Sequence, residues 1–229
     1  MRYAFRIAAL PSVCQLAMEG YPHFDRVTLN ETPLPPPTGY LIDPDLQTID
    51  VTDLLQIGEN TVELSFRYNT DIELENMALA GSFAVTRITA SGAMVAENLQ
   101  ITALPQQITG DSWARNGLPF YTGRLTYGCS FLSDGEPCML DLSDARALGC
   151  TVTLNGKREV RLCPPFVFDL SSALQPGENT LQIELIPGRK NLFGPLHVEN
   201  PAITDPDDFR FDSPFWQKAY ALHDFGLVF

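Results

Sequence analysis

The chain has 229 residues, 45% of them hydrophobic, which is enough for one large domain or two of ordinary size with buried cores. The formal net charge of −13 argues against nucleic acid as a partner, because acidic surfaces repel phosphate backbones. No apolar run approaches the roughly 20 residues that a membrane-spanning helix needs, and no run of Lys or Arg suits an anionic membrane.

The N-terminal segment has basic residues followed by an apolar stretch, as a secretory signal peptide has. Pro11 interrupts that stretch, and the side chains alternate as in a strand, so we interpret the segment as part of the fold and not as a signal peptide. The sequence predicts no localisation. We expect the chain to begin in mid-fold, which would leave the first domain incomplete at its N-terminus, with an exposed strand edge.

In the first half of the chain, the patterns are those of strands and turns. Residues 27–30 (Val-Thr-Leu-Asn) and 61–66 alternate between apolar and polar side chains, as in strands with one buried face. Residues 33–37 (Pro-Leu-Pro-Pro-Pro) predict a stiff surface loop. The segment from Asp50 predicts the end of a strand followed by a single turn capped by Asp and Thr side chains.

A polar, breaker-rich stretch at residues 107–111 interrupts the periodicity, so we predict one domain over 1–108 and a second over 109–229. Alternating patterns predict further strands in the second domain, at residues 124–127, 138–142, 160–163, 166–168 and 180–185. Only residues 143–148 and 215–222 would suit one or two helical turns. The chain is therefore predicted to be all-β, with two sheets packed face to face in each domain.

The two halves share sequence, which predicts an internal repeat. Val27-Thr28-Leu29-Asn30 recurs as Val152-Thr153-Leu154-Asn155, and seven of the twelve residues that start at Asp50 recur from Asp169. The offsets of 125 and 119 positions differ by six residues, which fall at the Pro-rich loop. We infer two tandem copies of one β-sandwich unit.

The hairpin turns of the two copies are expected to differ. Asn155-Gly156 is a strong two-residue hairpin signal, because both residues tolerate a positive φ. The first copy has Asn30-Glu31 at this position, so its turn is predicted to be of another kind.

Six segments of the second copy, in order, resemble motifs of a known fold. They are Gly117–Gly123 (GLPFYTG), Leu140–Asp144 (LDLSD), Val152–Gly156 (VTLNG), Pro164–Leu170 (PPFVFDL), Pro176–Asn179 (PGEN) and Asn191–His197 (NLFGPLH). This set resembles the sugar-binding, jelly-roll domains, of the galactose-binding-like fold, in family-2 glycoside hydrolases and α-L-rhamnosidase-like enzymes. It runs from about Trp113 to the C-terminus, whereas the first copy lacks the opening GxPFYxG strand.

The resemblance implies an accessory module, a spacer or a carbohydrate binder in a large, bacterial glycoside-hydrolase-like protein. Catalytic carboxylates in that family lie in a separate barrel domain, so none is carried over to this chain. The partners it implies are a carbohydrate or a catalytic glycosidase domain.

Carbohydrate binding requires aromatic faces for sugar C–H surfaces and polar side chains for the hydroxyls. Loops at the ends of a sandwich are where such residues gather. Six residues meet these criteria: Trp113, Tyr121, Arg189, Asn191, Phe193 and Trp216. The alternative for the aromatic residues, Tyr121 and Trp216 above all, is a place in the core.

Sequence patterns give little support to metal or catalytic chemistry. Asp205, Asp207 and Asp208 are a weak match to a structural calcium site, with a solvated acidic turn as the alternative. No cofactor motif is present, and the sequence has neither a GxSxG elbow nor a GxGxxG loop. The five cysteines show no zinc spacing and are interpreted as buried free thiols, with a Cys129–Cys138 disulfide as the alternative.

These patterns are compatible with three functions. The first is a non-catalytic carbohydrate-binding or accessory module of a glycoside-hydrolase-like protein. The second is a purely structural or interaction spacer. The third is a glycosidase whose two carboxylates lie between the copies. The sequence favours the first.

Overall fold

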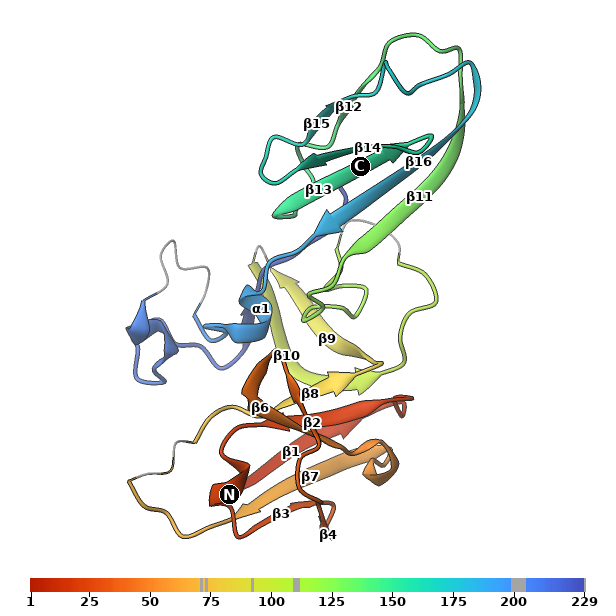
Figure 1. Ribbon diagram of the computed structural model, residues 1–229. Coiled ribbons are helices and arrows are strands. Elements are labelled where there is room, and N and C mark those ends of the chain that lie inside the picture. The colour runs from red at the N-terminus through yellow and green to blue at the C-terminus, as the bar shows by residue number, and fades with distance from the viewer. Residues whose placement is uncertain (71, 73, 92, 109–111, 199–204, 229) are drawn as a thin grey trace. The chain divides into compact units, whose positions relative to one another are not determined.

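The computed structural model describes residues 1–70, 72, 74–91, 93–108, 112–198 and 205–228, and for residues 87–97 only the backbone (Figure 1). Its contacts divide the chain into two compact units. The first comprises Met1–Arg87 with Asn98–Gln106, and the second comprises Ile88–Glu97 with Gln107–Phe229. The sequence places the boundary after residue 108. It does not predict that residues 88–97, which precede this boundary, group with the second unit. The prediction of an all-β fold is confirmed.

The first unit has two sheets, with strands in the orders β10-β1-β7-β3-β4 and β5-β6-β2-β8. Strand β9 pairs with β10, and parts of both strands belong to the second unit. Two short 3₁₀ helices complete the first unit. The elements are β1 (Arg2–Ile7), β2 (Cys14–Met18), η1 (Tyr21–His23), β3 (Arg26–Leu29), β4 (Thr32–Pro33), β5 (Gly39–Leu41), β6 (Asp43–Asp50), η2 (Thr52–Leu54), β7 (Gly58–Ser65), β8 (Ala78–Gly81), β9 (Ala84–Ser91) and β10 (Ala93–Thr102).

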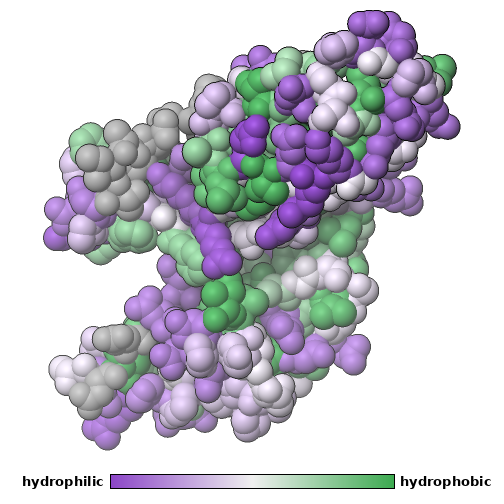
Figure 2. Space-filling view, turned by 45° about the horizontal axis from the view of Figure 1, so that its top comes forward, coloured by the Kyte–Doolittle hydropathy of each residue, from purple (hydrophilic) through white to green (hydrophobic). Residues whose placement is uncertain are grey.

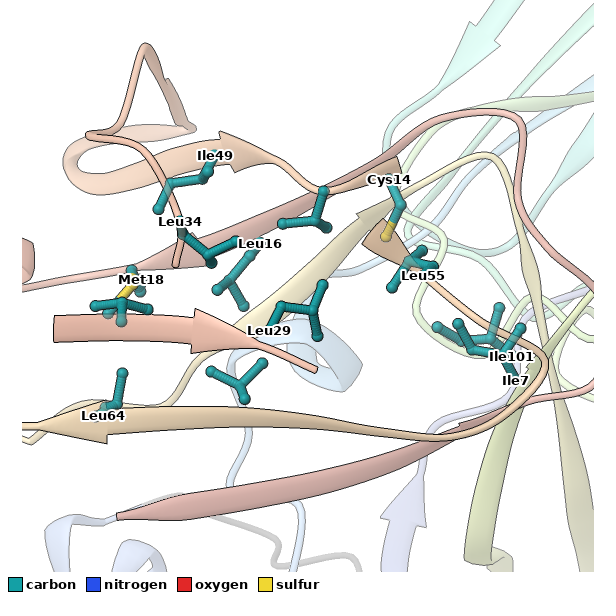
Figure 3. Close-up of a cluster of buried hydrophobic side chains, with 13 residues drawn as sticks. Ile7, Cys14, Leu16, Met18, Leu29, Leu34, Ile49, Leu55, Leu64 and Ile101 are labelled. Carbon is teal, nitrogen blue, oxygen red and sulfur yellow. The ribbon is translucent and has the colours of Figure 1, made fainter. Parts of the chain in front are cut away.

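Side chains from both sheets of the first unit form one buried core. Figure 3 shows Leu16 and Ile49 from one sheet and Leu29 and Leu64 from the other, pointing into the space between them. In β7, every second residue turns inward, and burial of such apolar stripes holds the two sheets together.

The second unit has a four-stranded sheet in the order β11-β16-β13-β14 and a two-stranded sheet of β12 and β15. Its core draws Val152 and Ile183 from the first sheet and Phe168 from the second. Strand β17 pairs with the Met94–Ala96 segment of β10. The elements are β11 (Leu125–Ser133), β12 (Met139–Asp141), β13 (Gly149–Leu154), β14 (Lys157–Arg161), β15 (Val167–Asp169), β16 (Gly177–Ile186), α1 (Lys190–Phe193), η3 (Pro206–Phe209) and β17 (Tyr220–Leu222).

The helix-like pattern at residues 215–222 does not form a helix, and that prediction is wrong. Tyr220–Leu222 is strand β17, which finds its partner in β10. Residues 143–148 form a turn and an isolated bridge from Arg146 to Gly226, again without a helix. In both places a long-range strand partner outweighs a weak local preference.

The hairpin turns of the two units have the same backbone conformation, which corrects the expectation that they differ. Asn155 and Gly156 have φ values of 50° and 85°, and Asn30 and Glu31 have values of 49° and 68°. Both central residues are left-handed in each turn, as in a type I′ hairpin. Glu31 adopts this conformation despite its Cβ, at a cost that glycine avoids.

An asparagine pair beside each hairpin joins two strands. In the first unit, Asn30 Nδ2 donates to Asn60 Oδ1 at 2.8 Å, and Thr61 N donates to Asn30 Oδ1 at 3.0 Å. In the second unit, Asn155 Nδ2 donates to Asn179 Oδ1 at 2.7 Å, and Thr180 N donates to Asn155 Oδ1 at 2.9 Å. The two units thus share a polar contact as well as a turn.

The inner asparagine of each pair also closes the turn that precedes its strand. Asn60, fully buried, accepts from Gln56 N at 2.9 Å and donates to Gln56 O at 2.7 Å. Asn179 accepts from Gln175 N at 3.0 Å and donates to Gln175 O at 2.8 Å. The amide and carbonyl of each side chain are therefore both engaged inside the fold.

Another shared feature is an aspartate that starts the turn after a strand. Thr52 donates its backbone N–H and hydroxyl to Asp50 Oδ1, which lowers the pKa of that carboxyl. Ser171 stands in the same relation to Asp169, with the same effect on the pKa. These carboxylates serve as acceptors for the backbone, as in other Asx turns.

The five cysteines are free thiols in the structure, and two of them are buried. Burial raises the pKa of Cys14 to about 12 and that of Cys150 to about 11. Cys129, Cys138 and Cys163 are exposed, which corrects the expectation that all five are buried.

Replacing Asn60 or Asn179 by Ala is expected to destabilise the chain by about 2–3 kcal/mol, because buried peptide groups lose their partners. Hydrogen exchange measured by mass spectrometry should localise the loss, to β7 and η2 for Asn60→Ala and to β16 for Asn179→Ala. Gln56→Ala is the matched control, because its exposed side chain makes one hydrogen bond, to Glu59 O. Equal effects of the control and Asn60→Ala would contradict the role of the asparagine.

Replacing Glu31 by Gly is expected to raise the free energy of unfolding by about 1 kcal/mol, because glycine adopts a positive φ without steric cost. The reciprocal change, Gly156→Glu, should lower it by a similar amount, since a Cβ there meets no atom within 4 Å and only the φ of +85° opposes it. Urea titration of both variants checks this. A loss of stability in Glu31→Gly would show that the Glu31 conformation carries no strain.

Native thiol titration should detect three fast-reacting cysteines, the exposed Cys129, Cys138 and Cys163. Cys14 and Cys150 should react only after unfolding, because the reactive thiolate is disfavoured by burial. Peptide mapping after labelling identifies the sites. Fewer fast thiols, with recovery on reduction, would instead indicate the Cys129–Cys138 disulfide.

Candidate carbohydrate-binding surface

The segment after β16 belongs to the second unit and holds four of the six candidate residues. Arg189 precedes helix α1, which carries Asn191 and Phe193, and a strand-like segment at residues 196–198 comes next in the chain. This segment pairs with residues 216–221, through a bridge from Val198 to Trp216 and a hydrogen bond from Ala221 N to Leu196 O at 2.6 Å. Trp216 is thereby joined to the segment that follows α1.

Asn191 is buried, at 3% exposure, and its polar atoms are engaged. Its Nδ2 donates to Pro119 O at 2.7 Å and to His223 O at 2.6 Å, and its Oδ1 accepts from His223 N at 2.7 Å. Asn191 therefore ties three segments together and does not reach a surface where it could bind a sugar.

Trp216 stacks on the ring of His197. The ring centroids are 5.0 Å apart and the rings are inclined by 26°. His197 also meets Tyr220 edge-on at 5.0 Å, and its Nδ1 lies 3.0 Å from Gln217 O. Because a carbonyl oxygen only accepts, this contact places the proton on Nδ1. His197 is thus fixed between two aromatic rings, and Trp216 is held on one side.

Aromatic side chains of α1 and of residues 209–216 are exposed to solvent. Trp216 is 38% exposed and Phe193 is 55% exposed. Phe209, Phe211 and Phe215 are more exposed still, at 60%, 84% and 72%. A Cβ on Gly194 would lie 3.6 Å from the Phe209 ring, so η3 lies against the end of α1. Figure 2 shows one face of the molecule, on which hydrophobic residues form several groups between hydrophilic ones.

Trp113 and Tyr121 lie in the second unit and differ in how much of each side chain is exposed to solvent. Trp113 is 1% exposed, packs in the core and donates from Nε1 to the Tyr127 hydroxyl at 2.7 Å. It has no ring face free for a sugar, so the alternative of a core role holds for this residue. Tyr121 is 40% exposed, and its hydroxyl donates to Arg124 O at 3.3 Å.

Two of the three aspartates considered for calcium accept hydrogen bonds from the local backbone, and the third pairs with an arginine. Asp205 and Asp208 form a capping box around η3: Asp205 Oδ1 accepts from Asp207 N at 2.8 Å, and Asp208 Oδ2 accepts from Asp205 N at 3.1 Å. Asp207 lies 3.6 Å from Arg210, a cation that competes with a metal. Within the described residues, no cluster of His, Cys, Asp and Glu suits a metal ion.

Among the described residues, each carboxyl whose pKa is shifted has a lowered pKa, and hydrogen bonds cause the shift. Arg210 contacts Asp212 with two hydrogen bonds of 2.9 and 2.7 Å and lowers its pKa. Ser143 does the same for Asp141. A general acid of a glycosidase needs the opposite shift.

Sequence patterns identify Phe193 and Trp216 as candidates but give no sign of their surroundings. The stack of His197 on Trp216 comes from a pairing between two stretches that are not consecutive in the sequence, and such a pairing has no local signature. Phe211 and Phe215 were missed because single exposed aromatic residues leave no periodic pattern.

The sequence matches no protein-family model and no curated protein. Among solved structures, similar chains are the α-L-rhamnosidase of Streptomyces avermitilis and a rhamnosidase of Novosphingobium sp. PP1Y, with 16% and 18% identity and TM-scores of 0.31 and 0.35. A β-glucuronidase of Bifidobacterium dentium has 17% identity and a TM-score of 0.30.

The alignments cover 87%, 100% and 61% of this chain, respectively, but only 22%, 22% and 26% of those chains. The chain thus spans about a quarter of the length of the glycoside hydrolases it matches. In the described residues, no helix is long and apolar enough to cross a membrane.

Proposed function

We propose that the chain is a non-catalytic, carbohydrate-binding accessory part of a glycoside-hydrolase-like protein. Its two units are copies of one jelly-roll sandwich, and the second carries the sugar site. The six ordered motifs of the second copy support the fold, and the asparagine pairs shared by the two units support the duplication.

The observation that carries the binding proposal is the Trp216–His197 stack. A sugar ring packs its C–H face on an aromatic ring whose orientation is already fixed, so that little side-chain entropy is lost on binding. His197 fixes Trp216 from one side, and 38% of Trp216 is left for a ligand.

Polar groups for the sugar hydroxyls come from the same loop region. Arg189 is exposed at the start of α1, and its guanidinium offers several donors. Phe193, at the other end of that turn, adds a second exposed ring. We exclude Trp113 and Asn191 from the proposed site because both are buried.

A second candidate, a docking module for a catalytic domain, is favoured by Phe209, Phe211 and Phe215. Large exposed aromatic residues that gather on one segment are typical of interaction surfaces. Phe215 directly precedes Trp216 in the chain, whereas Phe211 is not part of the proposed sugar site, so substitution of Phe211 separates the two roles.

The proposal predicts that the purified chain binds selected members of a panel of plant and bacterial glycans and that Trp216→Ala weakens binding by about tenfold or more, about 1.4 kcal/mol. Isothermal titration calorimetry against the best glycan measures both affinities. Tyr68→Ala is the matched control, an exposed aromatic residue of the first unit, and should leave the affinity unchanged.

Two further results bear on the alternatives. Phe211→Ala should not change glycan affinity, because that side chain is assigned to docking. No binding across the panel by a folded sample would overturn the carbohydrate role and leave docking as the better function.

A further inference from the structure

Strand β11 forms an open edge of the four-stranded sheet in the second unit. Its nine residues, Leu125–Ser133, pair with β16 along their whole length, from Ser133 opposite Gly177 to Leu125 opposite Leu185. In the strand order β11-β16-β13-β14 it is the first member, and no described strand pairs with its other side. Figure 1 shows it along the outside of that sheet.

The composition of β11 is unusual for an open edge. Natural sheets protect such edges with charges, prolines or short strands, because free N–H and C=O groups attract further strands. Strand β14, at the opposite edge, follows this rule with Lys157, Arg158, Glu159 and Arg161. Strand β11 (Leu-Thr-Tyr-Gly-Cys-Ser-Phe-Leu-Ser) has nine residues against five and contains neither a charge nor a proline.

In the first unit, the strand that corresponds to β11 has a neighbour on each side. Strand β1 pairs with β7 as β11 pairs with β16, in antiparallel register that ends at Gly58 and at Gly177 respectively. On its other side β1 pairs with β10, through Arg6 opposite Gln100. In the described second unit, β11 has only the first of these two neighbours.

We propose that β11 is a dimerisation edge, which pairs antiparallel with β11 of a second copy of this chain about a two-fold axis at Cys129. A second copy is the occupant because the strand is neutral, although the whole chain carries −13, so two copies meet here without charge repulsion. Cys129 is also the central residue of the nine, so a two-fold axis there uses the full strand.

The direction of the peptide groups fixes the register of this pairing. Thr180 directs both its N–H and its C=O toward β13, since N donates to Asn155 Oδ1 and O accepts from Asn155 N. Its neighbour Leu181 therefore directs its groups toward β11, where it faces Cys129.

In β11, Cys129 then uses its peptide groups on β16, while the alternate residues direct theirs outward. Those are Thr126, Gly128, Ser130 and Leu132. Pairing about Cys129 sets Gly128 opposite Ser130 and Thr126 opposite Leu132, pairs that exchange backbone hydrogen bonds. The two Cys129 residues would face each other in a non-hydrogen-bonded position, with Cα atoms about 4.5 Å apart.

The side chains of this register match on both faces of the ladder. Tyr127 of each copy lies opposite Phe131 of the other, an aromatic cross-strand pair that stabilises antiparallel strands. On the outer face, Thr126 lies opposite Leu132, which is 82% exposed in the single chain. The pairing thus covers a large apolar side chain that the described unit leaves in water.

The test is the association state of the full chain under reducing conditions, measured by sedimentation velocity from about 1 µM to about 1 mM. We expect a monomer–dimer equilibrium, and Cys129→Lys should weaken it by about tenfold, because two like charges would lie directly opposite. Cys163→Lys is the matched control: it replaces another exposed cysteine, outside β11, with the same charge, and should dimerise as the parent chain does.

A bismaleimide with a short spacer tests the register independently. With Cys138→Ser and Cys163→Ser in place, Cys129 is the sole exposed thiol among the five, and we expect a cross-linked dimer. Adding Cys129→Ser should abolish it. A monomer at all concentrations, or a dimer unaffected by Cys129→Lys and without cross-link, would overturn the proposal.

Discussion

Each unit depends on one buried asparagine, whose side chain forms hydrogen bonds with the turn that precedes its own strand. Asn60 and Asn179 each donate the amide to the backbone of the turn before β7 or β16, and each accepts at the carbonyl from a second asparagine of the neighbouring hairpin. Without the side chain, several buried peptide groups would lack partners, a cost that packing alone does not recover. The central strand of each main sheet therefore starts at a position set by one residue.

The start of β16 in turn sets the position of its neighbours in the second unit. With that start fixed at Gly177, the strand runs to Ile186, and β11 and β13 take their registers from it. The loop after its end leads into α1, and Asn191 in that helix ties the loop to the backbone at Pro119 and His223. The exposed rings of Phe193 and Trp216 thus project from a scaffold held by buried amides.

Much of this scaffold could be predicted from sequence, because its signals are local. The alternation in residues 180–185, the Asn155-Gly156 turn and the Asp-initiated turns each lie within a few consecutive residues. The hairpin at Glu31 was mispredicted because residue preference argues against a positive φ there, while the asparagine pair, a contact between distant strands, holds the turn in that conformation. At this turn, a tertiary contact outweighs the local preference.

The candidate site was harder to predict for the same reason. Trp113 and Trp216 both sit in loops near polar residues, and the sequence does not distinguish a ring that seals the core from a ring that faces water. What separates them is a partner: Trp113 donates its N–H to the half-buried Tyr127, whereas Trp216 packs one face on His197 and remains partly exposed. Since such partners come from separate segments, the difference between a core ring and an exposed ring appears only once the sheets are assembled.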